Sequence, residues 1–374
     1  MAFEARKSSS VELCVAEWVS GSRFRDQTTI FAEQSSERPL LDVAIHRLEP
    51  APRLASWHLA RSIRAFAAKK GSKLIATQQH IPTAARIALF NHGIPVVLHT
   101  HNFIDPPVKG KGAALRNWLR LKELQSLGGI TLVSDATLAQ FERDWPDVRI
   151  PRTVLSNGFD FSTWNTGRPK ENRIIVVGRV QEAKGILEVA QGVAQFLADA
   201  RDWTATFILS EPQSNKPYFE QIQSALQPVT GQAEILTGIP FATVKDITET
   251  SAIAVVASKW IEPFGRTALE AHAAGIALIS SGTGGLREIS GDGAVFLPEI
   301  SGTAIAESLR LLERDPASRA AMAERGAARV RRLFPLSSSS AGSDEAERIP
   351  SICERLDDFY DRVLAGSARP STSC

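Results

Sequence analysis

From residue 172 onward, short apolar and largely β-branched runs alternate with longer amphipathic stretches. Such alternation is typical of βαβ units built around a parallel sheet. The runs predicted as strands are residues 173–177, 204–209, 233–236, 253–257, 276–280 and 294–297, with helical stretches such as 184–200 and 266–274 between them. This half of the chain is therefore predicted to be a doubly wound α/β domain.

The first half alternates in the same way but less regularly. Basic helical segments join apolar runs and predict a second α/β domain; the runs are residues 11–15, 41–45, 73–76, 96–99 and 130–133. Segment 154–158 ends in an Asn-Gly turn between Pro151 and Pro169, which places the hinge there. A chain of 374 residues exceeds the size at which one hydrophobic core stops growing, and this favours two domains.

Composition narrows the classes of function. No apolar run approaches the ~18 residues of a membrane span, and the first residues do not resemble a secretion signal, so the cytoplasm is expected. The cysteines Cys14, Cys353 and Cys374 lie far apart without metal-ligand spacing, which predicts neither disulfides nor a zinc site. A net charge of +2 argues against nucleic-acid binding, although residues 1–165 carry +6 and residues 166–374 carry −4.

Two carboxylates flank a predicted helix start after the strand at 253–257. Glu262 precedes the helix and Glu270 lies inside it, with Gly265, Arg266 and Thr267 at its beginning. Unpaired N–H groups and the helix dipole make such a terminus a phosphate site. The alternative is that both acids merely complement the dipole.

Two further predicted strands are followed by candidate ligand-binding residues: cations after the strand at 173–177 and glycines after the strand at 276–280. Arg179 follows the strand at 173–177, and Lys184 stands at the next helix start. They are either diphosphate ligands or ordinary surface cations; the chain has no Asp-x-Asp pair to hold a metal, so they would carry the leaving-group charge. The loop 282–285 (GTGG) is a glycine-rich strand-to-helix loop, so its backbone could approach a ligand closely.

In combination these segments resemble the donor half of retaining GT-B glycosyltransferases, glycosyltransferase family 4, also called glycosyl transferases group 1. The matching motifs are VGR…KG at 177–185, E-x7-E at 262–270, EAHAAG at 270–275, GTGGLREI at 282–289 and VLSNGFD at 154–160. The resemblance implies a GT-B fold, with two Rossmann-like doubly wound domains facing a cleft. It implies an acceptor-side domain at 1–156, a donor-binding domain at 157–348, a helix at 349–365 crossing back to the first domain, and a disordered tail at 366–374.

The resemblance also implies roles for individual residues. Arg179 and Lys184 would bind the donor diphosphate, and Glu270 would accept hydrogen bonds from the ribose. Glu262 would face the transferred sugar and favour positive charge at the anomeric carbon. Other donor contacts would come from the amides of Phe264, Gly265, Arg266 and Thr267, and from the loop 236–239, with Gly238, beside the base.

In the first half, the run PVVLHTHN at 95–102 resembles the family strand that ends in an active-site histidine. His101 matches that position better than His99, and His80 and Asn102 are candidate acceptor contacts. A histidine at a strand end is otherwise a packing or turn residue. In the family, the first strand is followed by a glycine pair that contacts the donor phosphate; no such pair is found here, and Ser20-Gly21-Ser22 is the nearest candidate.

The implied activity is retaining transfer of a hexosyl unit, without metal or cofactor, from a nucleoside-diphosphate sugar (UDP before GDP) to a polysaccharide, lipopolysaccharide or lipid-linked hydroxyl. Two alternatives remain: a nucleotide-sugar epimerase of the same fold, and a non-catalytic nucleotide-sugar-binding or assembly protein. Basic segments 53–73 and 109–123 interleave cations with apolar residues. They are either ordinary surface helices or a peripheral contact with the anionic inner face of the cytoplasmic membrane.

Overall fold

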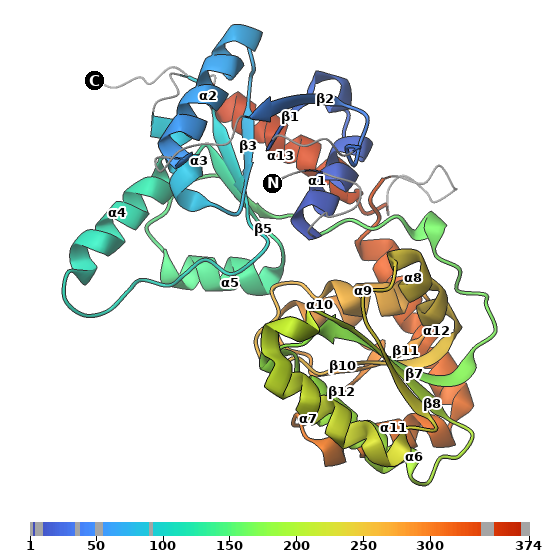
Figure 1. Ribbon diagram of the computed structural model, residues 1–374. Helices are drawn as coiled ribbons and strands as arrows, with labels where there is room; N and C mark the ends of the chain where they lie inside the picture. Colours follow the sequence, from blue (N-terminus) through green and yellow to red (C-terminus); the bar gives the residue numbers. More distant parts are fainter. Residues whose placement is uncertain are drawn as a thin grey trace. The chain divides into compact units, whose positions relative to one another are not determined.

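The computed structural model describes residues 3, 10–33, 38–48, 55–89, 93–337 and 348–367. The chain forms two compact units (Figure 1). The N-terminal unit comprises Met1–Phe159 together with Phe334–Cys374, and the C-terminal unit comprises Asp160–Leu333. The chain thus leaves the first unit once and returns to it.

The C-terminal unit is built on a six-stranded parallel sheet. Its strand order is β12-β11-β10-β7-β8-β9, the 3-2-1-4-5-6 order of a doubly wound fold. The strands are β7 (Glu171–Arg179), β8 (Thr204–Ser210), β9 (Ala233–Leu236), β10 (Ser251–Val256), β11 (Ala277–Ser280) and β12 (Ala294–Phe296). All six predicted strands are confirmed, with ends displaced by at most two residues.

Helices cover both faces of this sheet (Figure 1). One apolar core joins the strands to α6 (Ile186–Leu197), α7 (Lys216–Leu226) and α11 (Gly302–Arg314). The helices α8 (Phe241–Thr250), α9 (Arg266–Ala273), α10 (Gly285–Ser290) and α12 (Pro316–Leu333) lie across the sheet from them. Because both faces are covered, the central parts of the inner strands are apolar, which is why they were visible as continuous runs.

The N-terminal unit contains two parallel sheets. Four strands lie in sequential order, namely β3 (Ile75–Gln78), β4 (Val96–His99), β5 (Gly129–Leu132) and β6 (Arg152–Val154). A separate pair consists of β1 (Thr29–Glu33) and β2 (Ala44–Leu48). The helices are α1 (Ser10–Gly21), α2 (Ala55–Lys70), α3 (Ile81–Leu89), α4 (Ala113–Gln125), α5 (Asp135–Asp144) and α13 (Ile352–Ser367). The second α/β domain is confirmed.

One predicted feature of the first half is wrong. Residues 11–15 are helical rather than a first strand, because Cys14 and Trp18, four residues apart, form one buried face of α1. Ser20-Gly21-Ser22 therefore ends a helix instead of following a strand. Ser22 Oγ donates a hydrogen bond to Asp357, and a β-carbon at Gly21 would lie 2.5 Å from Cys353 Sγ. This segment contacts α13.

Helix α13 belongs to the N-terminal unit, where Phe359 and Val363 pack on Val97 of β4. A β-carbon at Gly129 would lie 2.9 Å from the Phe359 ring, so a glycine in β5 allows the helix to approach closely. Of the predicted tail, Gly366 and Ser367 end α13, and residues 368–374 lie outside the described residues. Among the described helices, none has the length and hydrophobicity needed to cross a bilayer.

Candidate active site

The candidate donor site lies where the winding direction of the C-terminal sheet reverses. Strands β7 and β10 are adjacent and parallel, and the chain leaves them toward opposite sides of the sheet. Open α/β sheets bind ligands beyond the carboxyl ends of the strands at such a point. Arg179 is the last residue of β7, the loop after β7 carries Lys184, and the loop after β10 carries Glu262. The topology thus brings together residues that the sequence separates.

These two loops are fastened to each other through the backbone. The Ala183 carbonyl accepts a hydrogen bond from the Lys259 N–H at 2.8 Å. Gly185 has φ +64°, and a β-carbon there would lie 2.1 Å from the Ala257 carbonyl oxygen. Only glycine combines that conformation with that approach, so its position in the VGR…KG motif has a packing reason.

The side chains of Lys184 and Glu262 meet between the loops. Lys184 Nζ lies 2.5 Å from Glu262 Oε1, and Ser258 Oγ donates to the same oxygen at 2.8 Å. Glu262 is 8% exposed. A buried carboxylate requires a counter-charge or hydrogen-bond donors, and here it has both. Ser258 was not among the predicted site residues, although it stands just beyond the end of β10.

Helix α9 begins directly beyond this pair. Its first helical residue is Arg266, and the preceding Gly265, at φ +112°, has no side chain to cap it. The backbone around Phe264 and Thr267 therefore presents a helix N-terminus, with its partial positive charge, next to the ion pair. Glu270 lies one turn further on, where its Oε1 accepts a hydrogen bond from Arg266 Nε at 3.2 Å.

The glycine-rich loop 282–285 packs against the loop that carries Glu262. The Gly285 N–H donates to the Glu262 carbonyl at 2.9 Å, and Thr283 Oγ1 donates to the Trp260 carbonyl at 2.9 Å. A β-carbon at Gly284 would lie 2.2 Å from the Glu262 carbonyl oxygen. This loop thus holds the backbone of Glu262 in place, a role that the sequence did not indicate.

The remaining donor-side candidates are more peripheral. Arg179 is exposed at the end of β7, and its guanidinium pairs with no carboxylate of the described residues. Gly238 lies in the exposed loop after the edge strand β9, with φ +65° and open space around its β-carbon position. This loop follows the edge strand, two strands away from β7 in the sheet.

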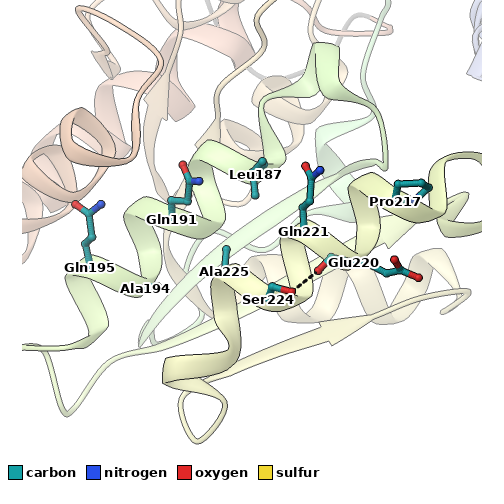
Figure 2. Close-up of a pocket in the computed structure, with 9 residues that line it drawn as sticks. All are labelled: Leu187, Gln191, Ala194, Gln195, Pro217, Glu220, Gln221, Ser224 and Ala225. Carbon is teal, nitrogen blue, oxygen red and sulfur yellow. Dashed lines mark hydrogen bonds between the residues drawn. The ribbon is translucent and has the colours of Figure 1, made fainter.

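A hollow of the C-terminal unit lies elsewhere. It has a volume of about 790 Å³ and lies between α6 and α7 (Figure 2). Its lining mixes amide and carboxylate side chains, including Gln191, Gln195 and Glu220, with apolar ones, and includes none of the predicted donor residues. This groove between two surface helices is therefore separate from the candidate site.

In the N-terminal unit, His101 lies just beyond the end of β4 and is held on several sides. Its ring stacks on Trp18, with centroids 5.5 Å apart and planes at 17°. Its Nε2 lies 2.9 Å from Gln78 Oε1, and its backbone N–H donates to Gln79 Oε1 at 2.7 Å. Trp18, Gln78 and Gln79 were not predicted, because their contacts join segments remote in sequence.

Burial lowers the pKa of His101 to about 4, while a hydrogen bond with the Asn157 side chain opposes that shift. The imidazole is therefore neutral at pH 7 and suited to donating or accepting a hydrogen bond without net charge. Asn157 Oδ1 in turn accepts a hydrogen bond from Cys14 Sγ at 3.2 Å. Asn157 belongs to the VLSNGFD segment, and that motif was the signal that could have identified it.

The other histidine candidates have local partners. His99 is fully buried, with ring nitrogens 2.7 Å from Thr131 Oγ1 and 2.8 Å from Tyr360 Oη, so it is a core residue. His80 begins α3, and its Nδ1 accepts a hydrogen bond from the Thr83 N–H at 3.3 Å. Asn102 is exposed beside His101. The predicted acceptor contacts of His80 and Asn102 remain predictions.

Comparison with solved structures identifies the fold class. The chain superposes on *Anabaena* Alr3699/HepE in complex with UDP with a TM-score of 0.75 and 16% identity, covering 97% of this chain and 98% of that one. Sucrose-phosphate synthase from *Thermosynechococcus elongatus* gives a TM-score of 0.71 and 18% identity over 96% and 94%. The chain thus has the two-unit, Rossmann-like fold of the GT-B glycosyltransferases.

Sequence comparison matches one unit to a family model. Residues 160–329, nearly the whole C-terminal unit, match the model described as Glycosyl transferases group 1. Alpha-maltose-1-phosphate synthase of *Mycolicibacterium smegmatis* is 26% identical over 57% of this chain and 60% of its own length. Spore coat protein SA of *Bacillus subtilis* is 24% identical over 46% and 50%. The chain thus matches little more than half the length of these relatives.

Proposed function

We propose that the protein is a retaining glycosyltransferase that moves a hexosyl unit from a nucleoside-diphosphate sugar, UDP before GDP, to a hydroxyl of a saccharide, lipopolysaccharide or lipid-linked acceptor. The observation that carries the proposal is the Lys184–Glu262 ion pair beside the N-terminus of α9, at the switch point of a doubly wound sheet. The match of the same unit to the model of Glycosyl transferases group 1 supports it.

In this proposal the donor diphosphate lies across the ends of β7 and β10. Arg179, Lys184 and the first-turn amides of α9 would balance the charge that develops on the leaving phosphate, so no metal would be required. Glu270 would accept the ribose hydroxyls. Lys184 would exchange its contact with Glu262 for one with phosphate, which leaves that carboxylate to face the sugar.

UDP is favoured by analogy. The structures of HepE in complex with UDP and with UDP-glucose match this chain with TM-scores of 0.75 and 0.72. The neutral imidazole of His101, in the N-terminal unit, is proposed to form a hydrogen bond with the reacting sugar or with the acceptor. Epimerisation and non-catalytic binding are the competing functions, and each predicts a different outcome in the same assay.

The test is release of nucleoside diphosphate by the full chain from UDP- and GDP-hexoses, with and without saccharide acceptors, in the presence of EDTA. Acceptor-dependent release, with retained anomeric configuration in the product by NMR, is expected. Conversion of the sugar without acceptor would indicate an epimerase, and binding without turnover a non-catalytic protein. Product of inverted configuration would exclude the retaining assignment.

A further inference from the structure

Helix α4 exposes an apolar stripe to solvent. Leu115, Trp118 and Leu119 are 62%, 53% and 49% exposed, and Lys122 continues the stripe one turn further. The spacing i, i+3, i+4, i+7 places all four on one side of the helix. Large apolar side chains gathered on one helix face, rather than scattered singly, mark an interaction surface.

The opposite side of α4 holds the helix to its unit. Leu124 is fully buried in the core around β4 and β5, and Leu121 packs against that core. The preceding loop is fastened by Asn117, whose side chain bonds both the N–H and the carbonyl of Val108 at 2.8 and 3.0 Å. In Figure 1, α4 follows the long loop after β4 at the edge of the N-terminal unit. The outward stripe is thus presented by an anchored helix.

The surroundings of the stripe are strongly basic. Residues 108–125 contain five Lys or Arg and one Glu, with Lys109, Lys111 and Arg116 in the loop and first turns. Arg116 Nη2 donates to the Lys111 carbonyl at 3.1 Å, so the cations are gathered at one end of the helix. An apolar stripe flanked by cations complements an anionic lipid surface, where the ring of a tryptophan lies at the headgroup level.

The other basic segment, in α2, does not have this form. Phe66 packs edge-on against Phe31 with ring centroids 4.9 Å apart, and it also contacts His46. Trp57 is 46% exposed, with the guanidinium of Arg86 5.0 Å from its ring. Among its described side chains, α2 thus exposes one large apolar residue, whereas α4 exposes three on one face.

We propose that the exposed face of α4, with Leu115, Trp118, Leu119 and the neighbouring cations, docks the protein on an anionic lipid surface. This inference deepens the proposed function, since a lipid-linked or lipopolysaccharide acceptor is presented at such a surface. It does not depend on the identity of the donor.

The test is co-sedimentation of the full chain with phosphatidylcholine vesicles that contain or lack phosphatidylglycerol, at low salt. The wild type should bind the anionic vesicles, and the triple variant Leu115→Ser, Trp118→Ser, Leu119→Ser should bind at least about tenfold more weakly. Leu311→Ser is the matched control, because Leu311 is 60% exposed on α11 of the other unit and should leave vesicle binding unchanged. Equal binding of the wild type and the triple variant, or no binding of the wild type, would overturn the proposal.

A second variant separates the charge from the apolar contribution. Lys109→Glu, Lys111→Glu and Arg116→Glu together should weaken binding to anionic vesicles by at least about tenfold without affecting neutral ones, and added salt should act in the same direction. A concentration-dependent dimer in the absence of lipid, abolished by the triple variant, would assign the stripe to a second copy of the chain and contradict lipid docking. Nucleotide binding by the triple variant, measured in parallel, distinguishes failure of docking from failure of the proposed transfer.

Discussion

Lys184 Nζ lies 2.5 Å from Glu262 Oε1, although 78 positions separate the two residues in the chain. The contact joins the loops after β7 and β10, the two strands at which the winding of the sheet reverses. The cation expected to bind the donor diphosphate is therefore held by the carboxylate expected to face the sugar. Donor binding must redistribute this pair.

The two partners should therefore respond in opposite directions to substitution. Lys184→Met removes the proposed phosphate ligand and should weaken UDP binding by about tenfold or more. Glu262→Gln releases Lys184 and should leave UDP affinity equal or higher, while the transfer rate falls by about 100-fold or more because transition-state charge stabilisation is lost. Calorimetric titration with UDP, combined with the release assay, measures both effects. Equal loss of UDP affinity in the two variants would contradict this account.

Gly185 provides a stability test of the same junction. A β-carbon there meets the Ala257 carbonyl oxygen at 2.1 Å, so Gly185→Ala should lower the free energy of unfolding by about 3 kcal/mol or more. Gly238→Ala is the matched control, since φ is nearly the same but the space is open, and its cost should be only the ~1–2 kcal/mol of left-handed strain. Similar losses in chemical denaturation would show that close approach is not the reason for the glycine.

His101 should affect turnover rather than nucleotide affinity, because its contacts lie in the N-terminal unit. His101→Asn is expected to reduce kcat by about 100-fold or more, with the dissociation constant for UDP unchanged. His58→Asn, an exposed histidine of α2, is the control and should retain wild-type rates. An unchanged kcat in His101→Asn would leave the residue with a packing role alone.

The free energy of unfolding should fall in acid, because the buried histidines stay neutral in the folded state over a pH range in which they are protonated in the unfolded state. Burial lowers the pKa of His272 to about 4, and neither ring nitrogen has a hydrogen-bond partner among the described residues. Between about pH 6.5 and 4 the unfolded state binds the proton first, so stability is complete above pH 6.5 and decreases as the pH falls, by up to about 3 kcal/mol from this residue. His99 and His101, with pKa values lowered to about 3 and about 4, act in the same direction.

Substitution isolates the contribution of His272. His272→Leu removes the titrating group and should flatten the dependence of the unfolding midpoint on pH across that window, with urea denaturation as the measurement. The slope rather than the absolute stability is compared, because the substitution also changes packing beside Gly326. A slope equal to that of the wild type would exclude His272 as a source of acid sensitivity.

The sequence predicted the C-terminal unit well because its strands are buried on both faces and stand out as apolar runs between helices. It predicted the first strand of the N-terminal unit wrongly, since residues 11–15 are apolar except for Glu12 and their helical period appears only when Trp18 is included. The boundaries between the two units, after Phe159 and before Phe334, likewise depend on the packing of α13 in the N-terminal unit, which the sequence alone does not give.

Candidate residues in the strand-end loops could be identified from motifs, but their partners could not. The ion pair of Lys184 with Glu262 and the stacking of Trp18 on His101 join segments that only the tertiary structure brings together. The glycines at 284 and 285 suggested contact with a ligand, whereas the structure gives them contacts with the loop of Glu262 and Phe264.

The most direct test of the central claim is a thermal-shift panel of UDP, GDP and ADP with their hexose conjugates on the full chain, because a ligand of the native state raises its stability. UDP and a UDP-hexose should raise Tm selectively; the shift should be lost in Glu270→Ala and retained in Glu307→Ala, an exposed acid of α11. A shift of equal size in both variants would place nucleotide binding away from Glu270. No shift with any nucleotide would contradict a donor site at the ends of β7 and β10.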